Sequence, residues 1–387
     1  MDGADHPDPA ETAPARPGRT RLSLRDRWRA FRNARLADPR FQRWAALFPA
    51  TRPTALRNAR ALFDVTAGFV YSQILFACVK LDLFRALADG PLETPELARR
   101  LDLPEESAER LARAAAALRL VERFDHGGWG LGDLGAAMLG APGVAEMVEH
   151  HAALYDDLED PVALLKARGG RIGQFWAYSR NPAAGEMTPE KVADYSALMA
   201  ASQATFAADV IAAYPFAKHA HLVDVGGGEG QFVRALAPKA KGLRFTVFDL
   251  PGVAELARAR FAEVGLADRA EAVGGDFFAD PIPSGDLYTL IRVCFDHDDA
   301  PATRLLTRIR ESMPEGATVI VAETMAGTRG AEPVGDAYFG FYLLAMGSGR
   351  PRTADELTRL LSAAGFTDIR EARSARPMLA RLLVARA

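Results

Sequence analysis

A run of glycines that follows an acidic residue is the part of this sequence best suited to chemistry. The acidic residue is Asp224, and the segment 224–230 that it begins includes Gly226 and Gly228. Apolar residues 222–225 lead into it and predict a strand, and the apolar spacing at 232–236 predicts a helix after it. Glycines let the backbone turn with positive φ and let a ligand approach without a Cβ in the way. The pattern therefore predicts a ligand-binding turn between a strand and a helix.

A second acidic residue stands at the end of the next predicted strand. Apolar residues 245–248 run into Asp249, which follows Asp224 by 25 positions. A carboxylate at the end of the second strand of a parallel sheet commonly binds ribose hydroxyls. We therefore expect a nucleoside-like cofactor at the carboxyl edge of the sheet, with Asp249 on its ribose.

The residues of the turn favour S-adenosyl-L-methionine as this cofactor. A dinucleotide fingerprint needs a glycine where Gln231 stands, and no Gly-Lys-Ser/Thr follows to form a phosphate-binding loop. Asp224 beside the turn attracts cations and repels a pyrophosphate. The sulfonium and ammonium groups of S-adenosylmethionine suit that charge. The alternative is an ordinary glycine turn without a ligand.

The following segments complete a nucleoside site and the sheet that positions it. Asp276 and Phe277 follow a short predicted strand, where Asp276 is placed to accept from an adenine amine and Phe277 to lie against its ring. The alternative for Asp276 is a simple turn-forming role. Predicted strands over 286–293 and 318–323 enclose a predicted helix over 302–313. Strands alternating with helices predict an α/β, doubly wound and mostly parallel sheet.

Length and composition bound the remaining possibilities. The chain has 387 residues, 49% of them hydrophobic, which suits two or three domains with a real core. Its two cysteines, Cys78 and Cys294, predict no disulfide framework and fit a reducing compartment. We find no apolar core of a signal peptide and expect no apolar run of the roughly 18 residues that span a bilayer. Residues 69–87 predict a buried helix or helix pair.

The amino-terminal segments differ from the rest in charge. Residues 1–20 are rich in Pro, Ala, Asp and Gly and predict a disordered tail. Residues 21–60 hold eleven arginines, with Leu24, Trp28 and Phe31 at helical spacing and Trp44 in a second apolar group with Leu47 and Phe48. A basic amphipathic arm with aromatic residues predicts contact with an anionic membrane surface. The alternative is an arm that packs on the protein and shows its arginines to water.

Three predicted helices and a hairpin follow between residues 69 and 131, the pattern of a winged helix. A winged-helix regulator that senses a nucleoside is thus an alternative function of another class. The helix that would contact DNA carries Glu105, Glu106 and Glu109 beside Arg110. This balance argues against phosphate contacts, so no nucleic acid is expected.

From about residue 60 to its end the chain resembles the small-molecule O-methyltransferases typified by the plant caffeate and isoflavone enzymes and their bacterial relatives. The resemblance implies a homodimer in which a winged-helix-like dimerisation domain (61–180) precedes a seven-stranded S-adenosylmethionine-binding domain (181–387). The motifs that carry it are residues 224–230, 248–251, 275–277, and 352–357 before 364–366.

Residues 38–44 and 68–73 extend the resemblance to the carotenoid hydroxyneurosporene (demethylspheroidene) O-methyltransferases of phototrophic bacteria. That family methylates the tertiary 1-hydroxyl of acyclic carotenoids. It implies a lipophilic substrate and a cytoplasmic protein, peripheral at the inner face of a photosynthetic membrane. Bacteriochlorophyllide methyltransferases share part of the pattern, so a tetrapyrrole or an aromatic polyketide is the alternative acceptor.

The resemblance also implies roles for single residues. Gly226 and Gly228 would approach the methionine moiety, Asp249 the ribose, and Asp276 with Phe277 the adenine. Arg292 is the nearest match to a basic residue near the end of the fourth strand, one place from the usual lysine. The full implied set of cofactor contacts is Asp224, Gly226, Gly228, Asp249, Leu250, Asp276, Phe277, Arg292 and Ser202.

The catalytic base is where the sequence departs from the family. Phe295 occupies the position of the family's histidine and cannot take a proton, whereas the acidic helper Glu323 is kept. The candidates for a base are His297, Glu323 and His151, whose neighbour is His150. Of the two neighbouring histidines only one is expected to face inward. The alternatives are that His297 only packs near adenine and that the proton is lost late to water.

The acceptor pocket is expected to be apolar, and no metal site is expected. Aromatic and methionine residues are as a rule core, so their number supports a large apolar ligand only weakly. The residues assigned to the pocket are Phe175, Trp176, Met199, Phe295, Phe339, Tyr342 and Met346.

Overall fold

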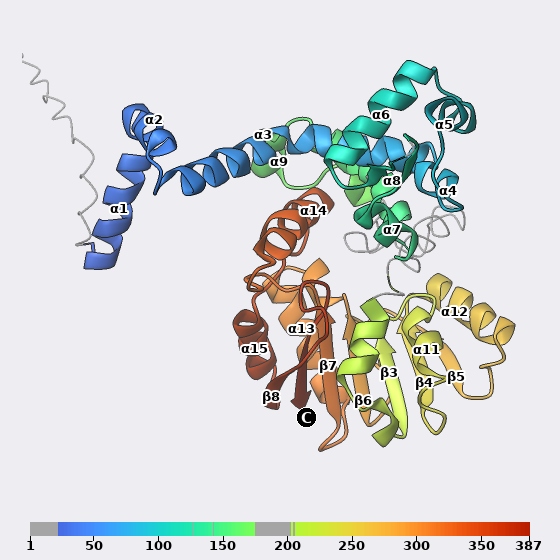
Figure 1. Ribbon diagram of the computed structural model, residues 1–387. Coiled ribbons are helices and arrows are strands. Elements are labelled where there is room, and N and C mark those ends of the chain that lie inside the picture. Colours follow the sequence, from blue (N-terminus) through green and yellow to red (C-terminus); the bar gives the residue numbers. More distant parts are fainter. Residues whose placement is uncertain (1–21, 126, 142, 175–202, 204–205) are drawn as a thin grey trace, which may run out of the picture. The chain divides into compact units, whose positions relative to one another are not determined.

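A computed structural model describes residues 22–125, 127–141, 143–174, 203 and 206–387 of the chain. The chain divides into two compact units, Met1–Ser72 and Gln73–Ala387 (Figure 1). Helix α3, which spans Arg52–Lys80, contains the boundary between them. The predicted division into 1–20, 21–60, 61–180 and 181–387 stays a prediction.

The first unit holds two short helices and most of α3. Ser23 caps α1 (Leu24–Leu36) by accepting from the Asp26 N–H, and Asp38 caps α2 (Pro39–Leu47). Among its described residues only Ala45 is buried. The aromatic residues predicted for this arm are exposed: Trp28 at 62%, Phe31 at 52% and Trp44 at 50%.

Helix α3 corrects two expectations from the sequence. Its 29 residues include an 18-residue window of mean hydropathy 1.6, so by length and composition it could cross a membrane, contrary to the expected lack of such a run. Arginines interrupt only its first part, and the apolar remainder is longer than we expected. A single helix of this kind is weak evidence for a span. The segment 69–87 is also not buried throughout, because Phe69 is 73% exposed whereas Cys78 and Leu83 are fully buried.

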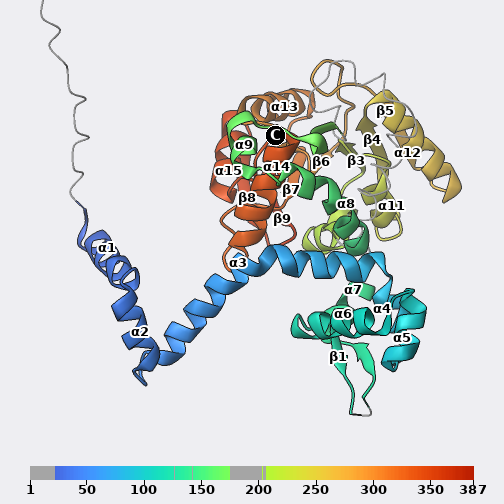
Figure 2. The same cartoon turned by 90° about the horizontal axis from the view of Figure 1, so that it is seen from above.

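The amino-terminal part of the second unit is a small helical domain with a hairpin, as predicted (Figure 2). Strands β1 and β2 pair antiparallel, with Val121 opposite Leu131. Leu83, Leu97 and Trp129 belong to one apolar core. Its elements are α4 (Leu83–Ala86), α5 (Thr94–Leu101), α6 (Glu105–Ala117), β1 (Val121–Arg123), β2 (Trp129–Leu131) and α7 (Asp133–Leu139).

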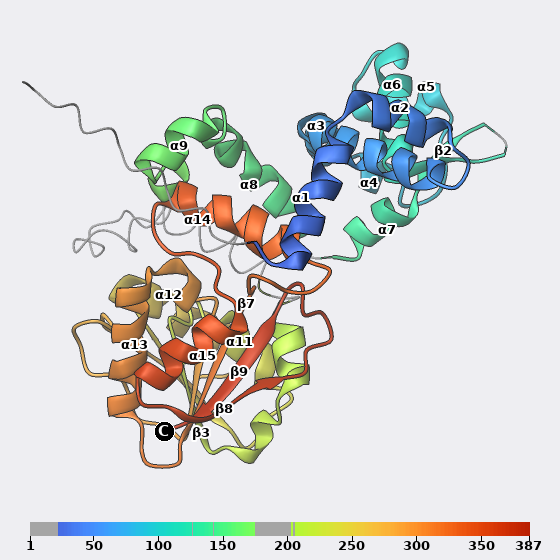
Figure 3. The same ribbon diagram turned by 90° about the vertical axis from the view of Figure 1, so that its left-hand side faces the viewer.

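Three further helices, α8 (Val144–Asp157), α9 (Pro161–Ala167) and η1 (Arg171–Gln174), precede the undescribed segment. The α/β domain then forms a seven-stranded sheet of order β5-β4-β3-β6-β7-β9-β8 (Figure 1). Figure 3 shows the side of the sheet that β8 and β9 form. Its strands are β3 (His221–Val225), β4 (Arg244–Asp249), β5 (Ala270–Gly274), β6 (Leu287–Ile291), β7 (Thr318–Glu323), β8 (Thr367–Ala372) and β9 (Arg381–Arg386). Only β9 runs antiparallel to its neighbours, so the predicted doubly wound, mostly parallel sheet is confirmed.

Helices cover both faces of this sheet. Strand residues alternate between two apolar clusters, one shared with α11 and α12 and the other with α13 and α15. The elements outside the sheet are η4 (Phe216–Lys218), α11 (Gln231–Leu236), α12 (Pro251–Glu263), η5 (Cys294–Asp296), α13 (Asp299–Ser312), η6 (Pro333–Phe339), α14 (Gly340–Met346) and α15 (Ala354–Ala363). The carboxyl ends of β3, β4 and β6 therefore meet at one edge, the place where such sheets bind ligands.

Candidate active site

The glycine turn connects β3 to α11 and is held by the backbone of β4. The Gly226 N–H donates to the Phe248 carbonyl at 2.8 Å. Gly226, Gly228 and Gly230 all have positive φ, of 69°, 58° and 74°. A Cβ on Gly230 would meet the Phe261 ring at 2.5 Å, whereas a Cβ on Gly228 would meet no atom within 4 Å. Gly230 thus serves packing, and Gly228 leaves open space beside the turn.

Asp249 is fixed by two backbone donors at the end of β4. The Gly228 N–H donates to Oδ2 at 2.8 Å, and the Leu250 N–H donates to Oδ1 at 2.7 Å. Burial raises the pKa of Asp249, and these two donors oppose the shift. Each carboxylate oxygen keeps a further lone pair that can accept from a hydroxyl group. The geometry therefore suits the predicted contact with a ribose.

Asp224 lies beneath the turn and is only 1% exposed. Its Oδ1 accepts from Thr289 Oγ1 at 2.6 Å, whereas Oδ2 has no hydrogen-bond partner among the described residues. Burial raises the pKa of Asp224 to about 7. An orphaned carboxylate oxygen at the turn fits a cationic donor, and the ammonium of S-adenosylmethionine is such a group.

Asp276 and Phe277 follow β5 at the same edge of the sheet. Asp276 is exposed, and its Oδ1 accepts from the Phe278 N–H at 2.7 Å, the turn-forming contact considered as the alternative. Phe277 packs edge-on against Phe278 and His297, with ring centroids 4.7 and 5.8 Å away.

His297 therefore belongs to an aromatic cluster next to Phe277. Its ring also lies edge-on to Phe278, with centroids 5.3 Å apart. Burial is the largest cause that lowers its pKa, to about 4, and Arg352 and Arg304 add to the shift. This position corresponds to the packing role considered for His297.

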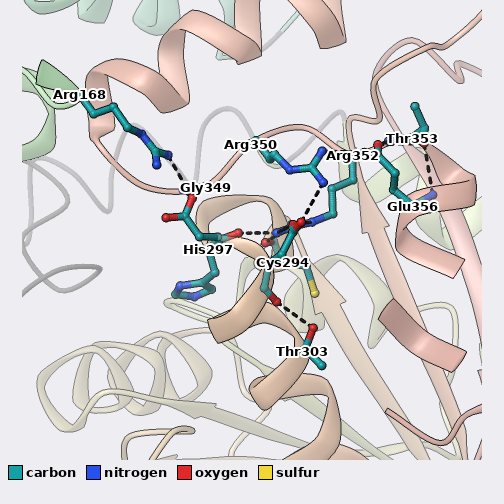
Figure 4. Close-up of polar contacts among 11 residues, drawn as sticks. Arg168, Cys294, His297, Thr303, Gly349, Arg350, Arg352, Thr353 and Glu356 are labelled. Carbon is teal, nitrogen blue, oxygen red and sulfur yellow. Dashed lines mark hydrogen bonds and ion pairs between the residues drawn. The ribbon is translucent and has the colours of Figure 1, made fainter. Parts of the chain in front are cut away.

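A buried arginine anchors the loop that contains Cys294 and His297 (Figure 4). Arg352 is fully buried, and its guanidinium donates to the Cys294 carbonyl at 2.8 Å and to the His297 carbonyl at 2.6 Å. It also donates to Asp299 Oδ1 at 2.8 Å. The motif around residue 352 thus shapes the loop. Only the resemblance to the family had pointed to this motif.

Glu323 supports the same loop from the end of β7. It is fully buried, and its Oε2 accepts from the Phe295 N–H at 3.0 Å. Its Oε1 has no hydrogen-bond partner among the described residues, and burial raises its pKa to about 7. Glu323 therefore holds the backbone at the position where the family has its base.

Both neighbouring histidines of α8 contact tyrosines, so the expectation that only one faces inward is wrong. His150 Nε2 lies 2.9 Å from Tyr342 Oη, and His151 Nε2 lies 2.7 Å from Tyr338 Oη. The two tyrosines are four residues apart and share one helical face. Sequence reasoning missed Tyr338, and a spacing of four from Tyr342 was the one signal available.

Phe295, Phe339, Tyr342 and Met346 pack in one apolar cluster. Tyr342 is 5% exposed and Met346 is fully buried, as expected of core residues. The predicted pocket residues Phe175, Trp176 and Met199, and the predicted cofactor contact Ser202, lie outside the described residues.

Arg292 stands just after β6 at the ligand-binding edge. Its backbone has a positive φ of 60°, and its N–H donates to the Ala322 carbonyl at 2.8 Å. Its guanidinium lies 5.9 Å from the centroid of the Phe206 ring. The structure therefore brings Arg292 to the same edge as Asp224 and Asp249.

No group of three metal-ligating side chains occurs among the described residues.

Two family models match the chain. Residues 155–367 match the O-methyltransferase domain, and residues 63–140 match the O-methyltransferase dimerisation domain. The second match covers the winged-helix-like part. The chain thus carries a dimerisation domain, which supports homodimer formation.

Relatives and solved structures agree with these matches. The chain is 41% identical to the demethylspheroidene O-methyltransferase of Cereibacter sphaeroides, over 89% of this chain and 92% of the relative. It is 38% identical to the enzyme of the same name from Rhodobacter capsulatus, over 96% of this chain and 91% of the relative. The chain is also similar to the crystal structure of the S-adenosylmethionine-dependent methyltransferase SibL, with a TM-score of 0.72 and 27% sequence identity. The matched region covers 84% of this chain and 98% of the SibL chain. The chain therefore belongs to the O-methyltransferase family and is an S-adenosylmethionine-dependent O-methyltransferase.

Proposed function

We propose that the enzyme methylates a hydroxyl group of an acyclic carotenoid, namely the tertiary 1-hydroxyl of hydroxyneurosporene or demethylspheroidene. The observation that carries this proposal is the similarity, over most of both chains, to two enzymes named for demethylspheroidene. The apolar surroundings of Phe295 support it, because an isoprenoid acceptor needs a surface without unpaired polar groups.

The residues of the turn supply alignment in this reaction. S-adenosylmethionine, when bound, supplies an electrophilic methyl group on a sulfonium. Asp249 and the orphaned oxygen of Asp224 would hold its ribose and its ammonium, and Gly228 leaves room beside them. Methyl transfer depends strongly on the alignment of the two reacting atoms, so a rigid turn contributes directly to the rate.

The acceptor is tested by mass spectrometry of candidate alcohols incubated with the enzyme and S-adenosylmethionine. A hydroxylated acyclic carotenoid, a bacteriochlorophyllide and an aromatic polyketide are compared. We expect the carotenoid to gain the mass of one CH₂ per molecule, and fragmentation to place it on the tertiary hydroxyl. Methylation of the tetrapyrrole or the polyketide alone would replace the proposed acceptor by that alternative.

We further propose that the arm of residues 21–60 binds an anionic membrane surface and keeps the enzyme at the inner face of a photosynthetic membrane. Exposed Trp28, Phe31 and Trp44 accompany eleven arginines in this segment. Aromatic residues insert at the headgroup level, and basic side chains attract anionic lipids.

Flotation with liposomes tests the arm. Wild-type protein should float with vesicles of phosphatidylglycerol and remain free with phosphatidylcholine. The variant Trp28→Ser/Phe31→Ser and a deletion of residues 1–60 should both lose binding. A control variant, Leu134→Ser, removes an exposed apolar residue outside the arm and should bind as the wild type does. Binding by the deletion variant would contradict the proposal.

A further inference from the structure

Two histidine–tyrosine pairs join α8 to the helical segment η6–α14. The pairs are His151 with Tyr338 and His150 with Tyr342, at 2.7 and 2.9 Å between ring nitrogen and phenol oxygen. These are hydrogen-bond distances, in which a neutral imidazole nitrogen can accept the phenol proton. Tyr338 lies on η6, a π-helical segment. Such segments are rare and frequently occur at functional sites.

The two pairs differ in their surroundings. Tyr342 is 5% exposed and lies within the apolar cluster, whereas Tyr338 is only partly buried. Tyr338 also feels the positive charge of Arg292, which lies just after β6 at the ligand-binding edge of the sheet. Arg292 interacts with both phenols, so solvent exposure is what distinguishes Tyr338 from Tyr342.

The position of Phe295 relates this pair to the missing base. The Phe295 ring packs on the Phe339 ring at a centroid distance of 5.8 Å, and the Phe339 ring packs edge-on against Tyr338 at 5.0 Å. Phe295 has no group that takes a proton, so an alcohol acceptor beside it needs another acceptor for its proton. Tyr338 and His151 are the nearest hydrogen-bonded pair along this line of rings.

We propose that Tyr338 and His151 remove the proton of the acceptor hydroxyl, with the Tyr338 phenol in contact with that hydroxyl and His151 Nε2 as the final proton acceptor. The inference rests on the proposed function in one respect, that the acceptor is an alcohol. A third histidine–tyrosine pair, His219 with Tyr214 at 2.9 Å, stands before β3, away from the carboxyl ends of the strands, and serves as its control.

The step balances in atoms and charge. A lone pair of the acceptor oxygen forms the new O–CH₃ bond while the C–S bond breaks and its electron pair stays on sulfur. The acceptor O–H bond breaks, its proton passes to Tyr338 Oη, and the phenol proton passes to His151 Nε2. One positive charge is present before the step, on the sulfonium, and one after it, on the imidazolium. Water takes the proton from His151 after the product leaves.

The surroundings keep both groups in the forms that this step needs. Burial is the main cause that lowers the pKa of His151 to about 4, and His150 adds to the shift. Burial raises the pKa of Tyr338 to about 12. Among the described residues, the other titratable or charged groups that face the pair are His150 and Tyr155 on α8, Tyr342 on α14 and Arg292 after β6. At neutral pH the imidazole is thus uncharged and the phenol keeps its proton.

A weak base is sufficient because methylation of an alcohol oxygen makes its proton very acidic. Proton transfer accompanies C–O bond formation, and a positioned neutral acceptor stabilises the positive charge that develops on the oxygen in the transition state. A histidine that stays neutral down to about pH 4 meets that requirement at neutral pH.

Four variants on the full-length enzyme test the proposal by kinetics. Tyr338→Phe and His151→Asn should each lower kcat by about a hundredfold, the lower end of general acid–base catalysis, with KM and cofactor affinity unchanged. Tyr214→Phe and His219→Asn, which alter the control pair, should keep kcat within about fivefold of the wild type. Equal losses in both pairs, or near-normal turnover of Tyr338→Phe and His151→Asn, would overturn the assignment.

A second measurement does not depend on turnover. In ¹⁵N-histidine-labelled enzyme, the His151 signal is identified by its loss in His151→Asn. Addition of the unmethylated carotenoid alcohol with S-adenosylhomocysteine should shift the His151 Nε2 signal in the wild type and in Tyr214→Phe, and leave it unchanged in Tyr338→Phe. A shift that persists in Tyr338→Phe would contradict contact through the phenol.

The two proposals fail in distinguishable ways. If wild-type enzyme does not methylate the carotenoid, the proposed function is wrong, and the same four variants are then assayed on whichever alcohol is methylated. If wild-type enzyme methylates the carotenoid and Tyr338→Phe does so equally well, only the inference on the base is wrong.

Discussion

On the donor side of the site, backbone N–H groups fix the carboxylate of Asp249 beside the glycine turn, whereas on the acceptor side the polar contacts join side chains from distant parts of the chain. The donor side consists of residues 224–230 with Asp249, whose oxygens accept from two backbone N–H groups. On the acceptor side, His151 meets Tyr338 across 187 positions of sequence.

This difference separates what is general from what is particular in the enzyme. The glycine turn can serve any methyl acceptor, because it would contact only S-adenosylmethionine, the common methyl donor. The acceptor side depends on single side chains, and Glu323 holds the backbone of Phe295, the residue that the resemblance places where the family has its base. A change of chemistry thus needs no change in the sheet.

The largest effect is expected where one side chain shapes the acceptor-side loop. Arg352→Met should lower the free energy of unfolding by about 3 kcal/mol, because the Cys294 and His297 carbonyls lose their donor in a buried place. Arg350→Met is the matched control. Its ion pairs with Asp299 and Glu356 are partly exposed, so it should cost less than about 1 kcal/mol. Urea unfolding measures both, and equal costs would remove the anchoring role.

The pH dependence of stability should reveal the buried carboxyl under Phe295. Burial raises the pKa of Glu323 from 4.5 to about 7, so between these values the folded protein binds more protons than the unfolded chain. Stability contributed by this group therefore falls as pH rises through that window.

Glu323→Gln should remove that fall and raise the free energy of unfolding at pH 8 by about 2 kcal/mol relative to the wild type, with little change at pH 4.5. Urea unfolding at the two pH values, without cofactor, measures the difference. Glu315→Gln changes an exposed glutamate and is the control. If the free energy of unfolding differs between Glu323→Gln and the wild type by the same amount at both pH values, Glu323 is charged in the folded protein.

The donor side was predictable from sequence and most of the acceptor side was not, for a physical reason. Asp224, Gly228 and Asp249 lie at strand ends that a parallel sheet brings together, so their spacing alone places them at one edge. Tyr338 meets His151 only because α8 packs on η6, and no periodicity within either helix specifies that pairing. The apolar helix α3 was misjudged for a related reason, since its exposed face gives the same pattern as a buried one.

A smaller effect is expected from the ribose carboxylate. Asp249→Ala should raise the cofactor dissociation constant at least about tenfold, or 1.4 kcal/mol. The loss combines the ribose contact with the freed N–H groups of Gly228 and Leu250. Calorimetric titration with S-adenosylmethionine measures it. Asp276→Ala, which removes an exposed turn contact, is the comparison. Unchanged affinity of Asp249→Ala would mean that the ribose lies elsewhere.

The smallest effect tests whether the open space at Gly228 belongs to the methyl donor. A Cβ there meets no protein atom within 4 Å, and the same holds at Gly265, which also has a positive φ. Gly228→Ala and Gly265→Ala should therefore lose similar stability, about 1 kcal/mol, from backbone strain alone. Only Gly228→Ala should also weaken S-adenosylmethionine binding, by about three- to tenfold, because the added methyl group takes space that the ligand needs. Because the two glycines are matched in backbone conformation and in free space, equal cofactor affinity in both variants would show that the turn contacts the ligand at another glycine.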